Sequence, residues 1–387
     1  MDSHGEARQT GPRAVDLRRA RTPDVSIVAC GTYDFLLSLH VVLASPDIDY
    51  ADYDIGREWI EAARQRCSAR DAGALATLGH YLGDGRPGSL HATLISLVAQ
   101  CPEPRDTAHF LDWLAQVPAT DLVEALLDQD GLGSDWPDLL HATLASVATD
   151  VGASERDETV IQRLLARYPA DLRSTVSAVL RDPESARAEL IAALRVWDEA
   201  VFAAERAHIL PMLKREAAAL ERQRGELPTD RFLKLAMRGV EWQRPVGLHA
   251  ILFAPSYFCR PAVFYHFWRG VLTFCYPVDT NRLQSETPAA DPRAPSEEML
   301  RFFEALGDAT RLRILRLLAE REMYLTELSE RLGLTKATTK HHMVRLRASG
   351  LVTLYDRDRM TYYALRPDVA RRAAQLLDEY LKLGPRR

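Results

Sequence analysis

The feature that most constrains the fold of this chain is the run from Tyr324 to Val352, YLTELSERLGLTKATTKHHMVRLRASGLV. Apolar residues recur at helical spacing on both sides of Gly333, and a glycine at this point permits a turn that needs a positive φ. Thr335 can cap the second helix because its hydroxyl can accept a backbone N–H. The run therefore predicts two short helices joined by a tight turn.

The neighbouring segments extend this pair of helices into a module over residues 296–384. Ser296 and Asp308 can cap two helices that come before the pair. After Gly350, two β-rich stretches flank a charged tip at residues 357–359, and a last helix follows. This order predicts a winged helix-turn-helix, in which the second helix of the pair is shaped to enter the DNA major groove.

The helix after Thr335 has one apolar face. Thr339, Met343 and Leu346 lie at i, i+4 and i+7 and should face the core. The polar and cationic side chains of the first turns then point outward, where a recognition helix reaches base edges. The alternative is a solvated helix end that carries its cations by chance. The DNA contacts we expect are on the helix and, near a phosphate or minor groove, on the wing: Lys336, Ala337, Thr338, Lys340, His341, Arg345, Arg357 and Arg359.

Two segments, EALGDATRLRILRLL and LTELSERLGLTKATTKHHMVRLRASGLV, followed by a wing and a final helix, resemble the ArsR-type winged helix-turn-helix transcriptional regulators. The resemblance covers about 90 residues, under a quarter of the chain. It implies a homodimer that represses transcription and pairs through the first and last helices of the module. Carried onto this chain, the dimer contacts are Met299, Leu300, Phe303, Leu376, Leu377 and Tyr380.

The chain departs from the metal-sensing members of that family. Those members place Cys-x-Cys on the third helix, whereas the matching stretch here, residues 322–326, reads EMYLT. The last helix has neither histidine nor cysteine. Because zinc and arsenite sites need thiolate or imidazole ligands, we expect no metal site of this type and no cofactor.

The chain before the module is predicted to be mainly helical. Residues 1–22 are polar and predict a mobile tail, and residues 23–276 hold apolar residues at helical spacing with breaks that suggest eight to eleven helices. Pro211 should break or kink a long helical stretch near Ile209. Residues 277–295 contain four prolines and almost no apolar residues, which is typical of a linker.

The amino-acid composition changes near Val246, where aromatic and β-branched residues become frequent. We expect three strands, near residues 246–254, 262–267 and 271–276, with Arg269-Gly270 as a hairpin turn. The aromatic clusters within them either line a pocket or subunit contact or form an ordinary sheet face packed on helices. The whole chain is thus predicted to be mainly α: a multi-helical N-terminal domain with a small antiparallel β segment, linked to a C-terminal winged helix-turn-helix domain.

Charge and composition agree with these expectations. Residues 296–387 hold 18 Lys and Arg against 13 Asp and Glu, whereas the rest of the chain holds 31 against 41. A basic module on an acidic body suggests a polyanionic partner. The five cysteines show no metal-binding spacing, which predicts buried thiols in a reducing cytoplasm. No apolar run approaches the ~18 residues of a membrane span, so we expect a cytoplasmic protein with no membrane partner.

The N-terminal part shows no catalytic fingerprint. GxSxG, HExxH and GxGxxG are absent from the sequence, so no catalytic residue and no enzyme activity are expected. Five histidines lie in separate helical stretches, where structural roles are favoured but clustering through the fold stays open: His40, His80, His91, His109 and His141. We expect a regulator that binds double-stranded DNA as a homodimer, with a small-molecule effector left open. The alternative is a small-molecule receptor or enzyme in the N-terminal domain, with the module serving regulation or protein interaction.

Overall fold

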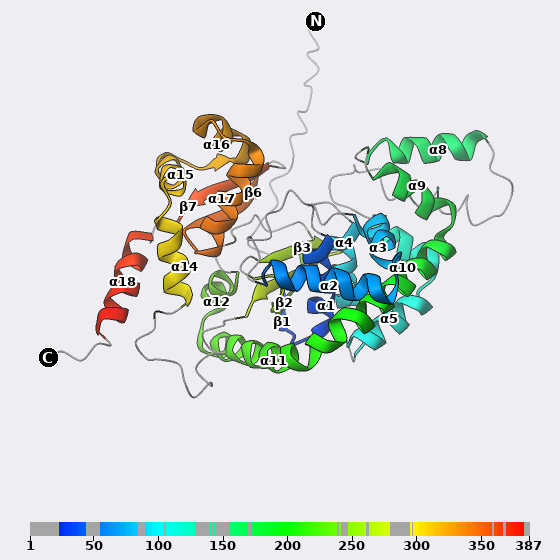
Figure 1. Ribbon diagram of the computed structural model, residues 1–387, viewed down its shortest axis with the longest axis horizontal. Coiled ribbons are helices and arrows are strands. Elements are labelled where there is room, and N and C mark those ends of the chain that lie inside the picture. The colour runs from blue at the N-terminus through cyan, green and yellow to red at the C-terminus, as the bar shows by residue number, and fades with distance from the viewer. Residues whose placement is uncertain are drawn as a thin grey trace, which may run out of the picture.

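The computed structural model describes most of the chain, and the tail predicted at residues 1–22 lies outside the described part. The described residues are 23–43, 55–83, 90–103, 106–127, 140, 143, 155–168, 170, 172–237, 240, 247–260, 263–278, 295, 297–357, 360–366 and 369–382. The fold is mainly α, as predicted, and consists of an N-terminal body and a C-terminal module (Figure 1).

The body is organised around one helix, α1 (Gly31–Leu43), that is buried on nearly every side. Such a helix needs apolar residues all round, and Phe35, Leu36 and Leu39 are fully buried. Further helices of the body are α2 (Arg57–Arg70), α3 (Ala74–Leu82), α4 (Leu90–Leu97), α5 (Thr107–Gln116), α6 (Ala119–Leu127), α8 (Glu155–Leu165), α9 (Arg173–Arg181), α10 (Pro183–Trp197), α11 (Ala203–Glu226) and α12 (Thr229–Ala236).

The strands of the body form one mixed sheet in the order β1-β2-β4-β3. Strands β2 (Ala250–Ser256), β3 (Phe264–Trp268) and β4 (Val271–Pro277) lie near the predicted positions. The expectation of an antiparallel segment is correct only for the β3–β4 hairpin. Strand β1 (Asp24–Ile27) was not predicted, and β1–β2 and β2–β4 are parallel pairs, because β3 passes to the outer edge before the chain returns as β4.

The sheet lies between two helical layers, and its residues alternate between them with the period of two that a strand imposes. On one face Phe253 and Phe274 pack with helices α11 and α12. On the other face Leu252 and Cys275 belong to the core around α1 and α4. The aromatic residues on β2 and β4 therefore form an ordinary buried sheet face, one of the two alternatives given above. The hairpin turn is also as predicted, with positive φ at Arg269 and Gly270.

The stretch predicted to break at Pro211 continues as helix α11 through the proline. The irregularity lies earlier, in a π-helical segment, η4 (Asp198–Phe202), that joins α10 to α11. Packing explains the difference, because Ile209 and Leu213 on either side of the proline are buried, and tertiary contacts of this kind override a local preference.

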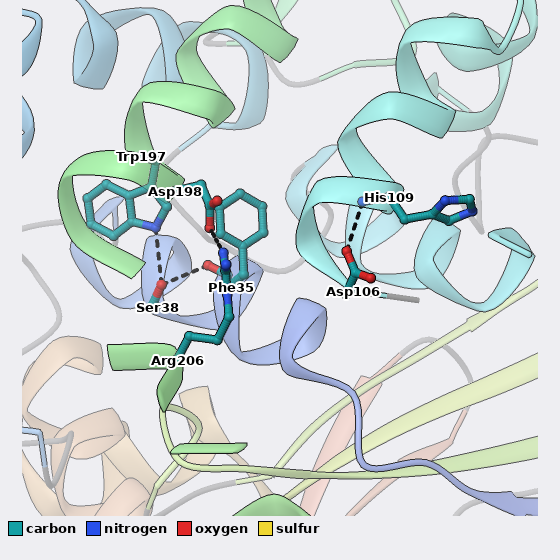
Figure 2. A network of polar contacts seen from close by, with 7 residues as sticks. All are labelled: Phe35, Ser38, Asp106, His109, Trp197, Asp198 and Arg206. Atoms are coloured by element: carbon teal, nitrogen blue, oxygen red, sulfur yellow. Dashed lines mark hydrogen bonds and ion pairs between the residues drawn. The ribbon is translucent and has the colours of Figure 1, made fainter. Parts of the chain in front are cut away.

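Figure 2 shows how the π segment is held. The Trp197 indole donates to the Ser38 hydroxyl on α1 at 3.1 Å, and Ser38 donates to the Phe35 carbonyl at 2.7 Å. Arg206 forms an ion pair with Asp198. These contacts tie the junction of the two long helices to the central helix. Nearby, the Asp106 side chain accepts the His109 N–H at 2.9 Å and caps α5.

A buried carboxyl joins α1 to the end of β2. Asp34, which is fully buried, accepts hydrogen bonds from the Ser256 hydroxyl, the Tyr257 N–H at 3.0 Å and the Phe258 N–H at 3.1 Å. Burial raises the pKa of Asp34 to about 6, against the opposing effect of these donors. The carboxyl therefore acts as a polar anchor between the helix and the sheet.

The C-terminal module consists of α14 (Glu297–Leu306), α15 (Ala309–Glu320), β5 (Met323–Tyr324), α16 (Leu325–Leu332), α17 (Lys336–Ala348), β6 (Val352–Arg357), β7 (Met360–Leu365) and α18 (Val369–Lys382). Its strands form a sheet in the order β5-β7-β6, and the module has a hydrophobic core of its own. No helix among the described residues is long and apolar enough to cross a membrane. The body's last strand ends at Pro277, and Val278 is buried in the body's core.

Candidate nucleic-acid interface

The turn between α16 and α17 has the geometry that the glycine predicts. Gly333 adopts the left-handed conformation, with φ 68° and ψ 32°. Its N–H donates to the Glu330 carbonyl, and the Leu334 N–H donates to the Ser329 carbonyl at 3.0 Å. These bonds satisfy carbonyls that a helix end otherwise leaves unpaired, and they fix the angle at which α17 leaves the turn.

Helix α17 begins with the predicted cap. The Thr335 hydroxyl accepts the Thr338 N–H at 3.1 Å. Thr339 donates back to the Thr335 carbonyl at 3.0 Å and is fully buried. Met343 and Leu346 are also buried in the module's core. The helix is thus seated on the face that its spacing predicts, and the opposite face holds no residue of the module's core.

The exposed face of α17 carries cations. Lys336, Thr338 and Lys340 are exposed at its amino end, whereas His341 and Arg345 are half-buried. Side chains at this end of a recognition helix can reach base edges, where lysine donates to guanine and threonine to several bases. The helix position of Ala337 is described, but its side chain is not.

A second group of polar contacts holds α15 against its neighbours. The Asp308 side chain accepts the Arg311 N–H at 2.8 Å and caps α15, as predicted. This hydrogen bond lowers the pKa of Asp308. The Arg311 guanidinium donates to the carbonyls of Ala305 and Glu304 at the end of α14. His342 on α17 lies 3.9 Å from Asp308, and burial lowers the pKa of this histidine. Helices α14, α15 and α17 therefore meet at one polar junction.

The wing is an antiparallel hairpin of β6 and β7. Arg357 lies opposite Met360 at the end of the ladder, where the predicted charged tip begins. The side chain of Arg357 and the whole of Arg359 lie outside the described residues. Tyr363 and Val352 are buried and attach the hairpin to the core, so the base of the hairpin is fixed beside α17.

The outer helices α14 and α18 pack together and border an apolar groove of about 300 Å³. Leu300 and Leu377 are 46% and 44% exposed, which is high for residues of this type. Leu376 differs from the other predicted dimer residues, because it is only 4% exposed and belongs to the core. The groove is lined by Pro295, Met299, Leu300, Phe303, Glu304, Leu377 and Tyr380.

The stretch that matches the metal-binding position of metal-sensing relatives has a structural role here. Met323 is fully buried in the module's core and pairs with Tyr363 in the small sheet. Across the described part of the chain, no group of three or more His, Cys, Asp or Glu side chains is placed to hold a metal ion. The five cysteines are all buried, and none forms a disulfide.

Two histidines of the body that lie on separate helices, His40 and His91, meet through the fold. The rings of His40 and His91 lie 5.2 Å apart, and His91 contacts the Leu36 carbonyl at 2.9 Å. Ser96 on α4 hydrogen-bonds His266 on β3 at 2.8 Å. Burial lowers the pKa of His91 to about 3, so its ring is neutral. Together these side chains form a polar layer between the helices and the sheet.

Comparisons with known proteins select the same module. Residues 308–353 match a family model described as "Bacterial regulatory protein, arsR family". An uncharacterized HTH-type transcriptional regulator from Methanocaldococcus jannaschii is 32% identical over 84 residues, which make up 21% of this chain and 94% of that protein. No solved structure matches the chain. The similarity thus falls on the part of the chain that presents α17.

Proposed function

The chain belongs to the ArsR family of bacterial regulatory proteins through its C-terminal module, and on this premise we propose that it is a homodimeric repressor in which α17 reads the DNA major groove. A role as a DNA-binding transcriptional regulator follows from the family. The observation that supports the proposed role of α17 is which of its faces is buried and which is exposed. Thr339 and Leu346 face the core, and Lys336 and Lys340 face solvent.

The proposed contacts divide by role. Lys336, Thr338 and Lys340 are proposed to contact base edges and nearby phosphates, since they lie in the first turns of the helix. Arg357 and Arg359 at the wing tip are proposed to bind the flanking backbone or minor groove. Phosphate contacts fix the position of the protein on the duplex, while base contacts provide the sequence preference.

The dimer is proposed to form through the groove between α14 and α18. Exposed Leu300 and Leu377 would be buried against the same surface of a second copy, as a two-fold interface requires. A symmetric dimer places two copies of α17 on half-sites about 34–36 Å apart. Repression then needs only that the occupied site overlap the region where transcription starts.

The regulatory signal is proposed to act through the N-terminal body. The metal-binding position of the metal-sensing relatives is occupied here by buried Met323, so a Cys-type metal signal is not part of the proposal. A receptor or enzyme role for the body stays a prediction. Mass spectrometry of small molecules released when the native-source protein is denatured would test it.

The DNA-binding proposal is tested with a pool of random-sequence duplexes. Selection by the full chain should enrich a near-palindromic site. Lys340→Ala should weaken binding to that site by about 1–3 kcal/mol if the lysine contacts a base. Lys234→Ala, which removes an exposed lysine of α12 in the body, is the matched control and should change little. Equal affinity for every duplex, with Lys340→Ala indistinguishable from Lys234→Ala, would contradict the proposal.

A further inference from the structure

The module and the body meet at one edge of the body's sheet. In Figure 1, α18 is the outermost helix of the module, and α17 lies on the side toward the body's strands. The contact involves β3, the outer strand of the sheet order β1-β2-β4-β3. Outer strands are surfaces that proteins usually cover, and here one side chain of the strand, Tyr265, packs against the DNA-binding module.

The side chain of Tyr265 on β3 contacts both the body and the module. Within the body its ring stacks on Phe274 of β4, with centroids 6.0 Å apart and planes inclined by 14°. The same side chain packs against the hydrophobic cluster of the module. The two cores are therefore joined by a half-buried aromatic side chain as well as by the connecting segment.

A second observation, an electrostatic effect and not a packing contact, places Lys340 of α17 near the end of α1. His40, at the end of α1, packs against Phe264 of β3 with ring centroids 6.0 Å apart. Burial, and after it the positive charge of Lys340, lowers the pKa of His40 to about 4. Because salt screens distant charges, this effect indicates that Lys340 lies close to the end of α1.

This arrangement leaves too little room for a duplex. A recognition helix enters a groove about 12 Å wide and about 8.5 Å deep, so DNA must surround its exposed side chains. Lys336, Thr338 and Lys340 keep exposed side chains, but Tyr265 and the end of α1 lie on the side of the module that α17 faces. The groove between α14 and α18, in contrast, is open to solvent on the other side of the module.

We propose that the structure is a closed, DNA-incompetent state in which β3 and the end of α1 hold the module, and that DNA binding requires α17 to leave this surface. The inference rests on the proposed function and adds its regulation: the body lowers DNA affinity by reducing the population of the open form. Apparent affinity falls by the fraction of molecules that are competent. Dimerisation through α14 and α18 is compatible with both states.

Residues 279–294 connect the body to the module, and a chain of that length spans at most roughly 55 Å.

A distance measurement on the full chain tests the proposal. Glu61 on α2 and Glu330 on α16 are exposed, and Glu61→Cys with Glu330→Cys provides two sites for nitroxide labels. The native cysteines are buried, so the new thiols should label selectively. The distance between the labels in free protein should be narrowly distributed. Adding the selected duplex, with binding confirmed by fluorescence anisotropy, should lengthen it by roughly 10 Å or more, because a duplex must fit beside α17.

Substitutions on β3 give an independent test. Tyr265→Ala should lengthen the label distance without DNA and raise the affinity for the duplex by roughly threefold or more, because the closed form loses a contact. Phe267→Ala is the matched control, since Phe267 lies on the same face of β3 and packs within the body. Phe267→Ala should change neither the label distance nor the affinity for the duplex. Tyr265→Phe keeps the packing and should behave like the original protein.

The outcomes separate this inference from the function on which it rests. An unchanged label distance in DNA-bound protein would overturn the closed state while leaving DNA binding established. A folded Tyr265→Ala protein with unchanged distance and unchanged affinity would do the same. If neither the original chain nor Tyr265→Ala binds any duplex of the random pool, the proposed function itself fails. If Tyr265→Ala does not fold, the label distance in the chain that retains Tyr265, measured with and without DNA, still decides whether the closed state exists.

Discussion

The N-terminal body and the C-terminal module use their polar side chains in opposite ways. In the body, Asp34 and His91 are fully buried, and Asp34 connects α1 to the sheet whereas His91 connects α4 to α1. In the module, Thr335 and Asp308 cap helix ends, and Lys340 is exposed. The hydrogen bonds of Asp34 and His91 link residues far apart in sequence, whereas the caps at Thr335 and Asp308 link residues three apart. The body is therefore built for a fixed interior and the module for a surface that meets a partner.

The largest expected effect comes from removing the body's buried carboxyl. Asp34→Ala leaves the Ser256 hydroxyl and the Tyr257 and Phe258 N–H groups without their acceptor. We expect the free energy of unfolding to fall by about 3 kcal/mol or more, since each buried unsatisfied group costs about 1–3 kcal/mol. Asp308→Ala in the module should cost about 1 kcal/mol, the usual value of a cap. Urea denaturation measures the free energy of unfolding of both variants. Equal losses of this free energy would contradict the contrast between the body and the module.

Two glycines with positive φ provide a sharper comparison. A Cβ on Gly270 would lie 2.3 Å from the His249 ring and 2.8 Å from the Gly247 carbonyl oxygen, whereas a Cβ on Gly333 would meet nothing within 4 Å. Gly333→Ala should therefore cost only the backbone strain, about 1–2 kcal/mol, and Gly270→Ala distinctly more. Gly333→Asn should recover part of the loss, because asparagine tolerates this conformation. Thermal unfolding measures all three, and a costlier Gly333→Ala would contradict the packing described here.

The buried histidines predict how body stability depends on pH. The folded-state pKa of His91, about 3, lies below the ordinary value of 6.5, and that of His40 is about 4. Below pH 6.5 the unfolded chain binds protons that the folded chain excludes, so stability is lost as pH falls. Asp34, with a pKa raised to about 6, opposes this, because its folded form holds a proton between about pH 4 and 6.

His91→Gln should reduce the slope of unfolding free energy against pH, between pH 6 and 4.5, by about 1.4 kcal/mol per pH unit, the value for one proton. Urea titrations at four or five pH values measure that slope. An unchanged slope in a folded His91→Gln protein would show that the ring of His91 is charged or solvated in the native state.

The smallest expected effect concerns the cap of the recognition helix. Thr335→Ala removes the acceptor for the Thr338 N–H and should destabilise the module by about 1 kcal/mol. Thr335→Ser keeps the hydroxyl and should retain most of the stability. Hydrogen exchange of the first-turn amides of α17 is the measurement, since faster exchange in Thr335→Ala alone would localise the effect to this helix end.

The contrast between local and long-range contacts also explains which parts of the fold could be predicted from the sequence. The turn at Gly333, the caps at Thr335 and Asp308 and the buried face of α17 are local, and spacing alone predicts them. Strand β1 is short and gains its partner from β2, more than two hundred residues later, so no local pattern marks it. The continuity of α11 through Pro211 likewise depends on packing.

The candidate site divides in the same way. Spacing identifies which residues of α17 face outward, and exposure of Lys336 and Lys340 agrees with it. The meeting of His40 with His91, and of Tyr265 with the module's core, could not be predicted, because each joins elements that are distant in the chain. Leu376 was assigned to the dimer surface by resemblance, but the turn of α18 directs it into the core.

The central claim is that α17 reads DNA through the major groove, and methylation interference tests it most directly. Dimethyl sulfate modifies guanine N7 in the major groove and adenine N3 in the minor groove, and these atoms lie on opposite edges of the base pair. On the selected duplex, we expect guanine N7 methylation to abolish binding at two clusters about one helical turn apart. Interference confined to adenine N3, or none at any base, would contradict the account.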